Sequence, residues 1–317
     1  MTSFQLDHLQ TLAALVDEGS FDAAARRLHV TPSAVSQRVR AMEQQAGKTL
    51  VQRTTPVLTT PAGDVVLRYA RQVLLLGRDT ETELGLQATD RGRTSMAIAV
   101  NADSLATWFI DALAAVPARL EVVFDIRRED QDHSAALLRS GTVMAAVTGT
   151  RDAVQGCTSR ALGIMRYRAV CRPALLDRAG LAPGAAARSA ADLSRLAETP
   201  VIIFDRKDDL QDRFLRDVGA ADLRSPRTYV PTSDGFERAV VAGLGWGLLP
   251  EQQCLARIAS GELVELAPHA PVDVLLYWQR WSLASPLLDE VTQVVEAAAL
   301  DHLIAPVSRS GRRPGSG

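Results

Sequence analysis

The sequence predicts an all-α domain at the N-terminus, one long helix after it, and a larger α/β region. Two short amphipathic segments are joined by a polar turn between residues 21 and 47. The stretch 62–91 contains no proline and has a helical pattern. From 94 to 306, apolar runs typical of strands alternate with helical stretches, which favours an α/β fold.

The segment 21–47 has the pattern of a helix-turn-helix. Ser20 is placed to cap the first helix, where apolar residues recur at helical spacing. Thr31 is a good N-cap and Pro32 suits the first helical position, so the second helix should begin at Pro32. Gly47 is a natural C-terminal stop. The alternative is a plain helical hairpin with a solvated arginine face.

The second helix of this pattern should have an apolar face formed by Ala34, Val35, Val39 and Met42. Its other side would offer hydroxyl, amide and guanidinium groups, which can bind base edges and phosphates. The sequence therefore predicts a recognition helix for DNA.

The flanks of the hairpin predict a winged domain. A helix from Phe4 to Glu18 would close a three-helix core. After Gly47, β-branched residues, threonine pairs and two prolines favour a short two-stranded wing. Arg53 and Thr54 in that wing are placed to touch phosphate. The residues expected to contact double-stranded DNA are Thr31, Ser33, Ser36, Gln37, Arg38, Arg40, Arg53 and Thr54.

Charge supports DNA binding only in this part of the chain. Between Ser20 and Thr60, six Lys and Arg residues stand against two acidic residues, whereas the whole chain is formally −2. An acidic protein with one basic patch is more typical of a sensor that carries a DNA-binding module. It is less typical of an architectural protein that binds DNA nonspecifically, which remains an alternative.

The long helix predicted from 61 to about 91 carries a seven-residue apolar pattern. Two copies could pair through it as a short coiled coil, and a dimer would offer two DNA-binding heads. The alternative is a single amphipathic helix lying on its own domain. The pattern consists of Val66, Tyr69, Val73, Leu76 and Thr80.

The α/β region should contain parallel strands with helices on both faces. Residues 96–100, 121–126 and 143–148 are expected to form buried strands, with helices near Leu105–Ala115 and Asp132–Arg139 between them. The later runs YRAVC, VIIF, TYV, WGLLP and VLLYW are further predicted strands.

Polar residues follow the predicted strands, where small ligands bind in such folds. Asp103 or Ser104 should cap the next helix, whose free N–H groups could bind a carboxylate; simple capping is the alternative. Four strand ends carry carboxylates, which suits an amino acid with a cationic side chain. For Asp205 and Asp208 the alternative is a solvated helix start. The predicted effector-binding residues are Asp103, Ser104, Asp130, Thr148, Asp205, Asp208, Thr232 and Ser233.

Several motifs resemble a known family. Residues 23–53, AAARRLHVTPSAVSQRVRAMEQQAGKTLVQR, followed by LTTPAG, resemble the winged helix-turn-helix of LysR-type transcriptional regulators, although many members have Phe where Leu50 and Val51 stand. The motifs NADSLATWF, EDQDHS, FDRKDDLQD and GLGWGLLP resemble the lysine/arginine-export regulator branch of that family, the ArgP/LysG type.

This resemblance implies a fold, partners and an effector. It implies a winged domain at 1–60, a dimerising linker helix at 61–91 and an effector domain at 92–306 of the two-lobed periplasmic-binding-protein type. Lobe 1 would comprise 94–167 and 272–306, and lobe 2 would comprise 168–271. It also implies a dimer or tetramer, possible contact with RNA polymerase, and sensing of lysine or arginine to activate an exporter gene; a different effector is the alternative.

Other chemistry has little support in the sequence. Cys157, Cys171 and Cys254 form no CxxC pair, so we expect no metal site and no cofactor beyond the effector. No nucleophile, base and orienting group stand at a recognisable spacing, so an enzyme is not expected. We expect a cytoplasmic protein without a membrane partner, since no signal pattern and no long apolar run occur. Residues 307–317 are expected to be disordered.

Overall fold

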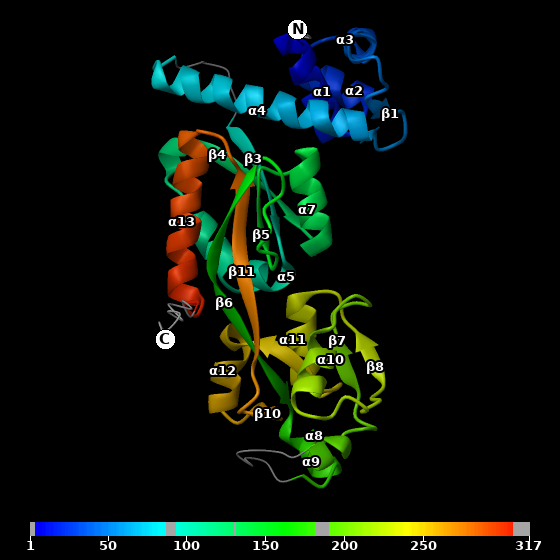
Figure 1. Ribbon diagram of the computed structural model, residues 1–317, viewed down its shortest axis with the longest axis vertical. Helices are drawn as coiled ribbons and strands as arrows, with labels where there is room; N and C mark the ends of the chain where they lie inside the picture. The colour runs from blue at the N-terminus through cyan, green and yellow to red at the C-terminus, as the bar shows by residue number, and fades with distance from the viewer. Residues whose placement is uncertain (1–3, 87–92, 130, 182–189, 307–317) are drawn as a thin grey trace, which may run out of the picture. The chain divides into compact units, whose positions relative to one another are not determined.

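The structure is a computed structural model that describes residues 4–86, 93–129, 131–181 and 190–306 (Figure 1). The chain divides into two compact units. Unit 1 comprises Met1–Val100, Val116–Arg160 and Trp278–Val294, and unit 2 comprises Asn101–Ala115, Ala161–Tyr277 and Val295–Gly317. The predicted disordered tail lies outside the described residues. Within the described ranges, no helix is both long and apolar enough to cross a membrane.

The N-terminal region contains three helices, of which the second and third begin where their capping residues predict. The three helices are α1 (Leu6–Glu18), α2 (Phe21–Arg27) and α3 (Pro32–Ala46). The Ser20 hydroxyl accepts a hydrogen bond from the backbone N–H of Ala23, and Thr31 Oγ1 caps α3 in the same way, each at 3.2 Å. These caps satisfy N–H groups that the first helical turn leaves free. The predicted helix-turn-helix is confirmed.

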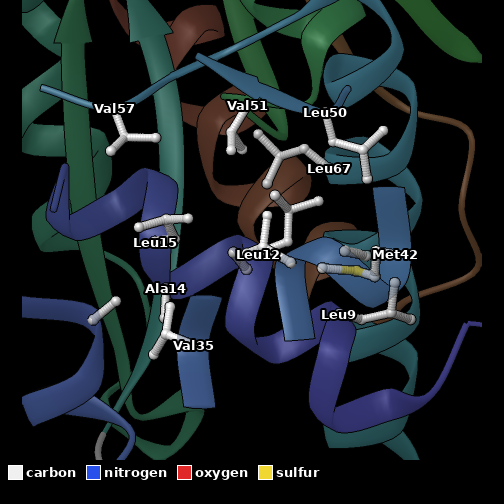
Figure 2. Packing of buried hydrophobic residues seen from close by; sticks show 14 of the residues in the cluster. Leu9, Leu12, Ala14, Leu15, Val35, Met42, Leu50, Val51, Val57 and Leu67 are labelled. Atoms are coloured by element: carbon white, nitrogen blue, oxygen red, sulfur yellow. The ribbon is translucent and has the colours of Figure 1, made fainter. Parts of the chain in front are cut away.

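The core of this domain joins the helices to the segments that follow (Figure 2). Leucines of α1 pack against the apolar face of α3, and Leu50 and Leu67 close the cluster from the wing and the long helix. The predicted three-helix core is thereby confirmed and extended. Its fully buried large side chains are Leu9, Leu12, Leu15, Met42, Leu50 and Leu67.

The wing consists of two short antiparallel strands, β1 (Val51–Gln52) and β2 (Leu58–Thr59). Their register pairs Val51 with Thr59 and Gln52 with Leu58. Val51 is buried in the N-terminal core, so the wing is anchored to the helices. The predicted two-stranded wing is confirmed.

The long helix α4 (Pro61–Glu83) begins at the predicted residue, with Thr60 Oγ1 accepting from the N–H of Gly63 at 3.0 Å. The helix ends at Glu83, so the predicted end near residue 91 is wrong; Leu84 and Gly85 already form a turn. The predicted apolar seam is wrong in part, because Val66 is buried in its own domain and Val73 packs against that core. The exposed apolar side chains in α4 are Val65, Tyr69 and Leu76.

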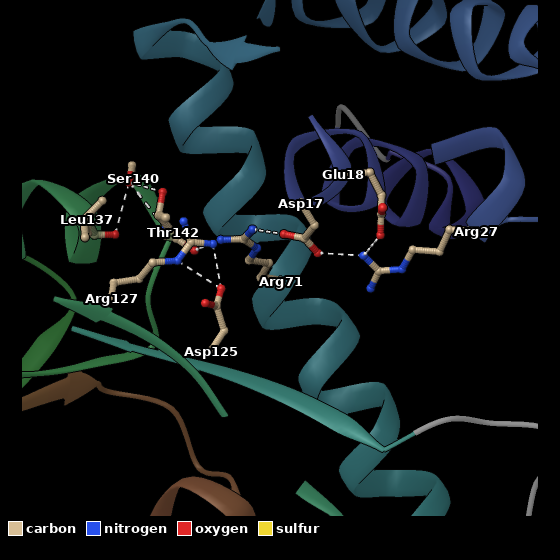
Figure 3. Close-up of polar contacts among 10 residues, drawn as sticks. Asp17, Glu18, Arg27, Arg71, Asp125, Arg127, Leu137, Ser140 and Thr142 are labelled. Carbon is tan, nitrogen blue, oxygen red and sulfur yellow. Dashed lines mark hydrogen bonds and ion pairs between the residues drawn. The ribbon is translucent and has the colours of Figure 1, made fainter. Parts of the chain in front are cut away.

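An arginine of α4 ties this helix to α1 (Figure 3). Arg71 pairs with the carboxylate of Asp17, which also pairs with Arg27 at 3.2 Å. The other terminal nitrogen of Arg71 donates to the carbonyl oxygen of Gly141 at 2.6 Å. Only 11% of the Arg71 side chain is exposed, so these contacts replace most of its hydration.

Unit 1 also contains the first strands of the α/β region. Strand β3 (Thr94–Val100) pairs in parallel with β4 (Val122–Arg128) and with β5 (Ala145–Thr148), and α7 (Gln131–Ser140) precedes β5. The prediction that the strand near 121–126 is buried is wrong. It is the edge strand of the sheet, so Val123 remains 40% exposed.

Unit 2 contains a mixed set of strands rather than the predicted parallel one. Strand β6 (Cys157–Cys171) pairs antiparallel with β9 (Gly247–Pro250) and β10 (Val264–Glu265), whereas β7 (Val201–Ile203) and β8 (Arg227–Tyr229) are parallel. The sequence gives no sign of strand direction, because parallel and antiparallel buried strands share one apolar pattern.

The remaining elements are mostly helices, and two strands belong to both units. Strands β6 and β11 contribute residues to unit 1 and to unit 2. The helix predicted near Leu105–Ala115 starts earlier, at Ala102, and includes a π-helical turn. These elements are α5 (Ala102–Ser104), the π turn η1 (Leu105–Phe109), α6 (Ile110–Ala114), the 3₁₀ turn η2 (Ala118–Leu120), α8 (Pro173–Arg178), α9 (Ala190–Ser194), α10 (Leu210–Asp217), α11 (Ser233–Val241), α12 (Glu251–Ala259), β11 (Val272–Trp281) and α13 (Pro286–His302).

Candidate DNA-binding surface and effector site

Helix α3 presents a polar arc opposite its buried face. Val35, Val39 and Met42 are fully buried, as predicted. At 3.6 residues per turn, positions 33, 36, 37 and 40 fall within one arc on the far side. Ser33, Gln37 and Arg40 are exposed there, and Ser36 is half-buried. This arc has the donor and acceptor groups that a recognition helix needs.

Arg38 does not belong to this arc, which corrects its predicted placement. Its guanidinium donates to Thr11 Oγ1 at 3.1 Å and pairs with Asp7 at 3.3 Å, both on α1. A residue four positions before Met42 lies about 40° from it around the helix, so Arg38 flanks the buried face. Contact between Arg38 and DNA stays a prediction.

The remaining predicted DNA residues, Thr31, Arg53 and Thr54, lie at exposed positions but have local partners. The Thr31 hydroxyl caps α3 and lies 2.8 Å from the Ser33 hydroxyl. In the wing, the Arg53 guanidinium lies over the Phe21 ring at 5.5 Å, and Thr54 Oγ1 donates to the carbonyl of Pro56 at 2.7 Å. These contacts orient the wing side chains beside the helix-turn-helix.

In unit 2, the carboxylate of Asp103 is the centre of a hydrogen-bond network. The Tyr167 hydroxyl donates to its Oδ2 at 2.8 Å, and the Ser233 hydroxyl donates to its Oδ1 at 2.7 Å. Gln253 Nε2 in turn donates to the Ser233 oxygen at 3.1 Å. Sequence analysis found Asp103 and Ser233 but missed Tyr167, although it stands in the predicted strand YRAVC, and Gln253.

The predicted helix cap at this point is wrong. Helix α5 starts at Ala102, so the N-cap position belongs to Asn101, whose side chain makes no capping bond. Asp103 and Ser104 instead lie within the first turn, and Ser104 is fully buried. A carboxylate in the first turn already complements the helix N-terminus, so this end does not favour a second anion.

A second carboxylate acts on the same network. Asp208 accepts the backbone N–H groups of Phe204 and Leu210, each at 3.0 Å. It also bonds with the side chain of Gln211, and the charge of Asp103 acts on it. The predicted neighbour Asp205 has a local role, because its Oδ1 accepts the N–H groups of Lys207 and Asp208 in a turn.

Burial raises the pKa of both carboxyl groups above the ordinary value. For Asp103, hydrogen bonds from Ser233 and Tyr167 offset part of this effect. For Asp208, bonds from the backbone and from Gln211 offset part of it, while the charge of Asp103 raises the pKa further. Burial, followed by the charge of Asp103, raises the pKa of Tyr167 well above its ordinary value. The network is therefore a site where a bound cation would be favoured.

In the part of the chain that the structure describes, two other predicted effector residues, Thr232 and Thr148, make their hydrogen bonds elsewhere. Thr232 Oγ1 accepts from the N–H of Gly235 at 3.2 Å and caps α11. Thr148 belongs to unit 1, where its hydroxyl donates to the carbonyl of Thr150 at 3.1 Å. Asp130 lies outside the described residues. Of the eight predicted residues, the contacts of unit 2 bring together Asp103, Asp208 and Ser233.

The cysteines and acidic residues offer no metal site in the ranges that the structure describes. None of the three cysteines, all of which the structure describes, forms a disulfide. Burial raises the pKa of Cys157 to about 11 and that of Cys254 to about 12. Both thiols are therefore protonated at neutral pH, which makes them poor nucleophiles.

The fold and the site define a class of protein, the DNA-binding regulators that respond to a small molecule. The defining features are the winged helix-turn-helix, the long helix and the α/β domain with a buried polar network. The model of the bacterial regulatory helix-turn-helix proteins of the lysR family matches residues 6–64, and that of the LysR substrate binding domain matches residues 89–299. The chain belongs to the LysR family. The predicted fold class is confirmed, as is the expectation of a regulator rather than an enzyme.

Similar proteins extend over almost the whole chain. The HTH-type transcriptional regulator LysG of Mycobacterium tuberculosis is 44% identical, over 99% of this chain and all of that protein. The crystal structure of ArgP from M. tuberculosis is 43% identical, with a TM-score of 0.80 over 94% of this chain and 98% of that one. Full-length LysG from Corynebacterium glutamicum with bound effector Arg is 38% identical, with a TM-score of 0.72 over 95% and 99%.

Proposed function

We propose that this protein is a sequence-specific transcriptional regulator that senses lysine or arginine and controls an amino-acid exporter or a related gene in the cytoplasm. The observation that carries the effector class is the Asp103 network of unit 2, where two carboxylates are partly buried and the charge of Asp103 raises the pKa of Asp208. Such a pair is stabilised by a cation that donates hydrogen bonds. The structure of LysG from Corynebacterium glutamicum with bound effector Arg supports the same ligand class.

In this proposal Asp103, Asp208 and Ser233 form the centre of the effector site. Ser104, Asp205 and Thr232 of unit 2 are assigned to the same site, while effector contact by Asp130 and Thr148 stays a prediction from the sequence. The division into a winged domain (1–60), a linker helix (61–91) and a two-lobed effector domain (92–306) is part of the proposal, supported by the separate family matches at 6–64 and 89–299.

The proposed DNA surface consists of the polar arc of α3 with Arg53 and Thr54 in the wing. A dimer would place two such surfaces on a pseudo-palindromic site. The exposed apolar residues Val65, Tyr69 and Leu76 on α4 support pairing of two copies along that helix. Effector binding would then act by shifting the population of DNA-bound conformations.

The test of the effector class is calorimetric titration of the full-length protein with arginine, lysine and leucine. We expect saturable binding of at least one basic amino acid and none of leucine, because leucine has no side-chain cation for the carboxylates. Equal binding of leucine, or no binding of either basic amino acid, would contradict the proposed effector class and leave the family assignment intact.

Replacing Arg40 by alanine should weaken DNA binding through a lost phosphate or base contact. If Arg40 contacts phosphate, affinity falls to a similar extent on unrelated sequences, and the slope of log K against log salt decreases by about 1. Gln37→Ala should instead cost roughly 1–3 kcal/mol on the cognate site alone, because Gln is suited to base edges. Fluorescence anisotropy at several salt concentrations measures both effects, and unchanged binding in both variants would exclude this face of α3.

A further inference from the structure

Among the residues that the structure describes, several buried oxygen atoms beside the Asp103 network have no hydrogen-bond partner, and three of them belong to residues tied to it. These three are Ser104 Oγ, Gln211 Oε1 and Gln253 Oε1. Ser104 is 0% exposed and Gln211 is 3% exposed. Each belongs to a residue already tied to the network, since Ser104 follows Asp103 in the chain, Gln211 bonds with Asp208, and Gln253 bonds with Ser233. Buried acceptors without partners are rare in native proteins.

The partners of the two glutamines fix which way their amides face. Asp208 is a carboxylate that can only accept when ionised, so Gln211 must donate to it through Nε2. The Ser233 hydroxyl donates its proton to Asp103, so its oxygen can only accept from Gln253, which must also donate through Nε2. Both side-chain carbonyl oxygens are therefore left as free acceptors in the network.

The network consequently offers acceptors and almost no free donors. The hydroxyl protons of Tyr167 and Ser233 are both committed to Asp103. The two carboxylates already accept hydrogen bonds but have no cation beside them in this network, and the two amide oxygens have no donor. A guanidinium group presents five N–H donors in a plane and an ammonium group presents three, so the guanidinium can satisfy more of these oxygens at once.

We propose that Gln211 and Gln253 are specificity-determining residues of the effector site, whose side-chain oxygens accept hydrogen bonds from the cationic group of the bound amino acid. This inference rests on the proposed function. Asp103 and Asp208 supply charge to any basic effector, while the two glutamine oxygens favour the group with more donors. Unit 2 therefore binds arginine more tightly than lysine, and the glutamines account for the difference.

The experiment measures arginine and lysine affinities by calorimetry for the wild type and for Gln211→Leu, Gln253→Leu and Gln252→Leu. Gln252 is the matched control, because it neighbours Gln253 on α12 but donates its Nε2 to the carbonyl of His302 at 2.7 Å and is not part of the network. Each network variant should bind arginine about tenfold more weakly or worse. The loss for lysine should be smaller, so the arginine-to-lysine ratio falls, whereas Gln252→Leu keeps both affinities.

A change in that ratio distinguishes direct contact from a structural effect, since a misfolded site would lose both ligands alike. If a leucine variant fails to fold by circular dichroism, the methionine variant at the same position repeats the test with a longer, more flexible side chain. Equal ratios in the wild type and both folded network variants would overturn the inference while leaving the proposed function intact. No binding of arginine or lysine by the wild type would instead contradict the proposed function itself.

Discussion

Gly63→Ala is expected to destabilise the winged domain by about 3 kcal/mol or more and to abolish DNA binding. A Cβ at this position would lie 1.9 Å from the carbonyl oxygen of Leu50 and 2.9 Å from its carbon. That carbonyl cannot move freely, because it accepts the backbone N–H of Thr60 at 2.9 Å and Leu50 itself is fully buried. The first turn of α4 would have to separate from the wing. Urea denaturation of the purified variant measures the loss.

Gly77→Ala is the matched control in the same helix. A Cβ there meets nothing within 4 Å, and alanine has the higher helix propensity. The control should therefore stabilise the protein by about 0.5–1 kcal/mol, with DNA binding unchanged. If both alanine variants had the same stability, the close approach of α4 to Leu50 would not be a structural requirement.

The helix boundaries of the winged domain could be predicted because capping is local. Ser20, Thr31 and Thr60 each accept a hydrogen bond from an N–H three residues later, and Gly47 ends α3 with a positive φ of 63°. All of these interactions depend on residues that adjoin in the sequence. The side chains whose predicted placement was wrong are held by tertiary contacts. Arg38 is held by α1, and Val66 is covered by the core of its own domain.

The proposed effector site could be predicted only at its strand ends. Asp103, Asp208 and Ser233 follow predicted strands, where ligands gather in α/β folds. Their partners come from distant parts of the chain, since Tyr167 is 64 residues from Asp103 and Ser233 is 130 residues from it. Strand YRAVC alternates between two faces, and no sequence pattern states which face meets Asp103. Gln253 lies in a helix that carries no ligand-binding motif, so its place required the structure.

Asp103→Asn is expected to weaken arginine binding by at least about 2 kcal/mol, a factor of roughly 30 in Kd. Asparagine nearly matches the shape of aspartate and can still accept a bond from Tyr167 or Ser233, so the fold should persist. What is lost is the charge that attracts the cationic group. Asp217→Asn is the matched control, because it removes the same charge from an exposed residue at the end of α10. Titration by calorimetry should show normal affinity in the control.

The pH dependence of binding should separate loss of charge from loss of shape. Burial raises the pKa of Asp103, so this group takes up a proton at a higher pH than an ordinary aspartate with a pKa of 3.8. The wild-type affinity for arginine should therefore fall as the pH is lowered from neutral, and Asp103→Asn should show a flatter profile, with Asp208 as the remaining titrating group. An equally steep pH dependence of arginine affinity in the variant would show that Asp103 does not bind the cationic group.

Protonation of Asp103 weakens arginine binding but stabilises the unliganded protein. The folded protein binds this proton more tightly than the unfolded chain does, so the free energy of unfolding decreases as the pH rises through the interval between 3.8 and the raised pKa. Above that interval the ionised carboxylate destabilises the unliganded protein. A bound cation offsets this cost, so arginine should raise the melting temperature more at neutral than at acidic pH. Asp103→Asn, which cannot ionise, should lose most of that difference.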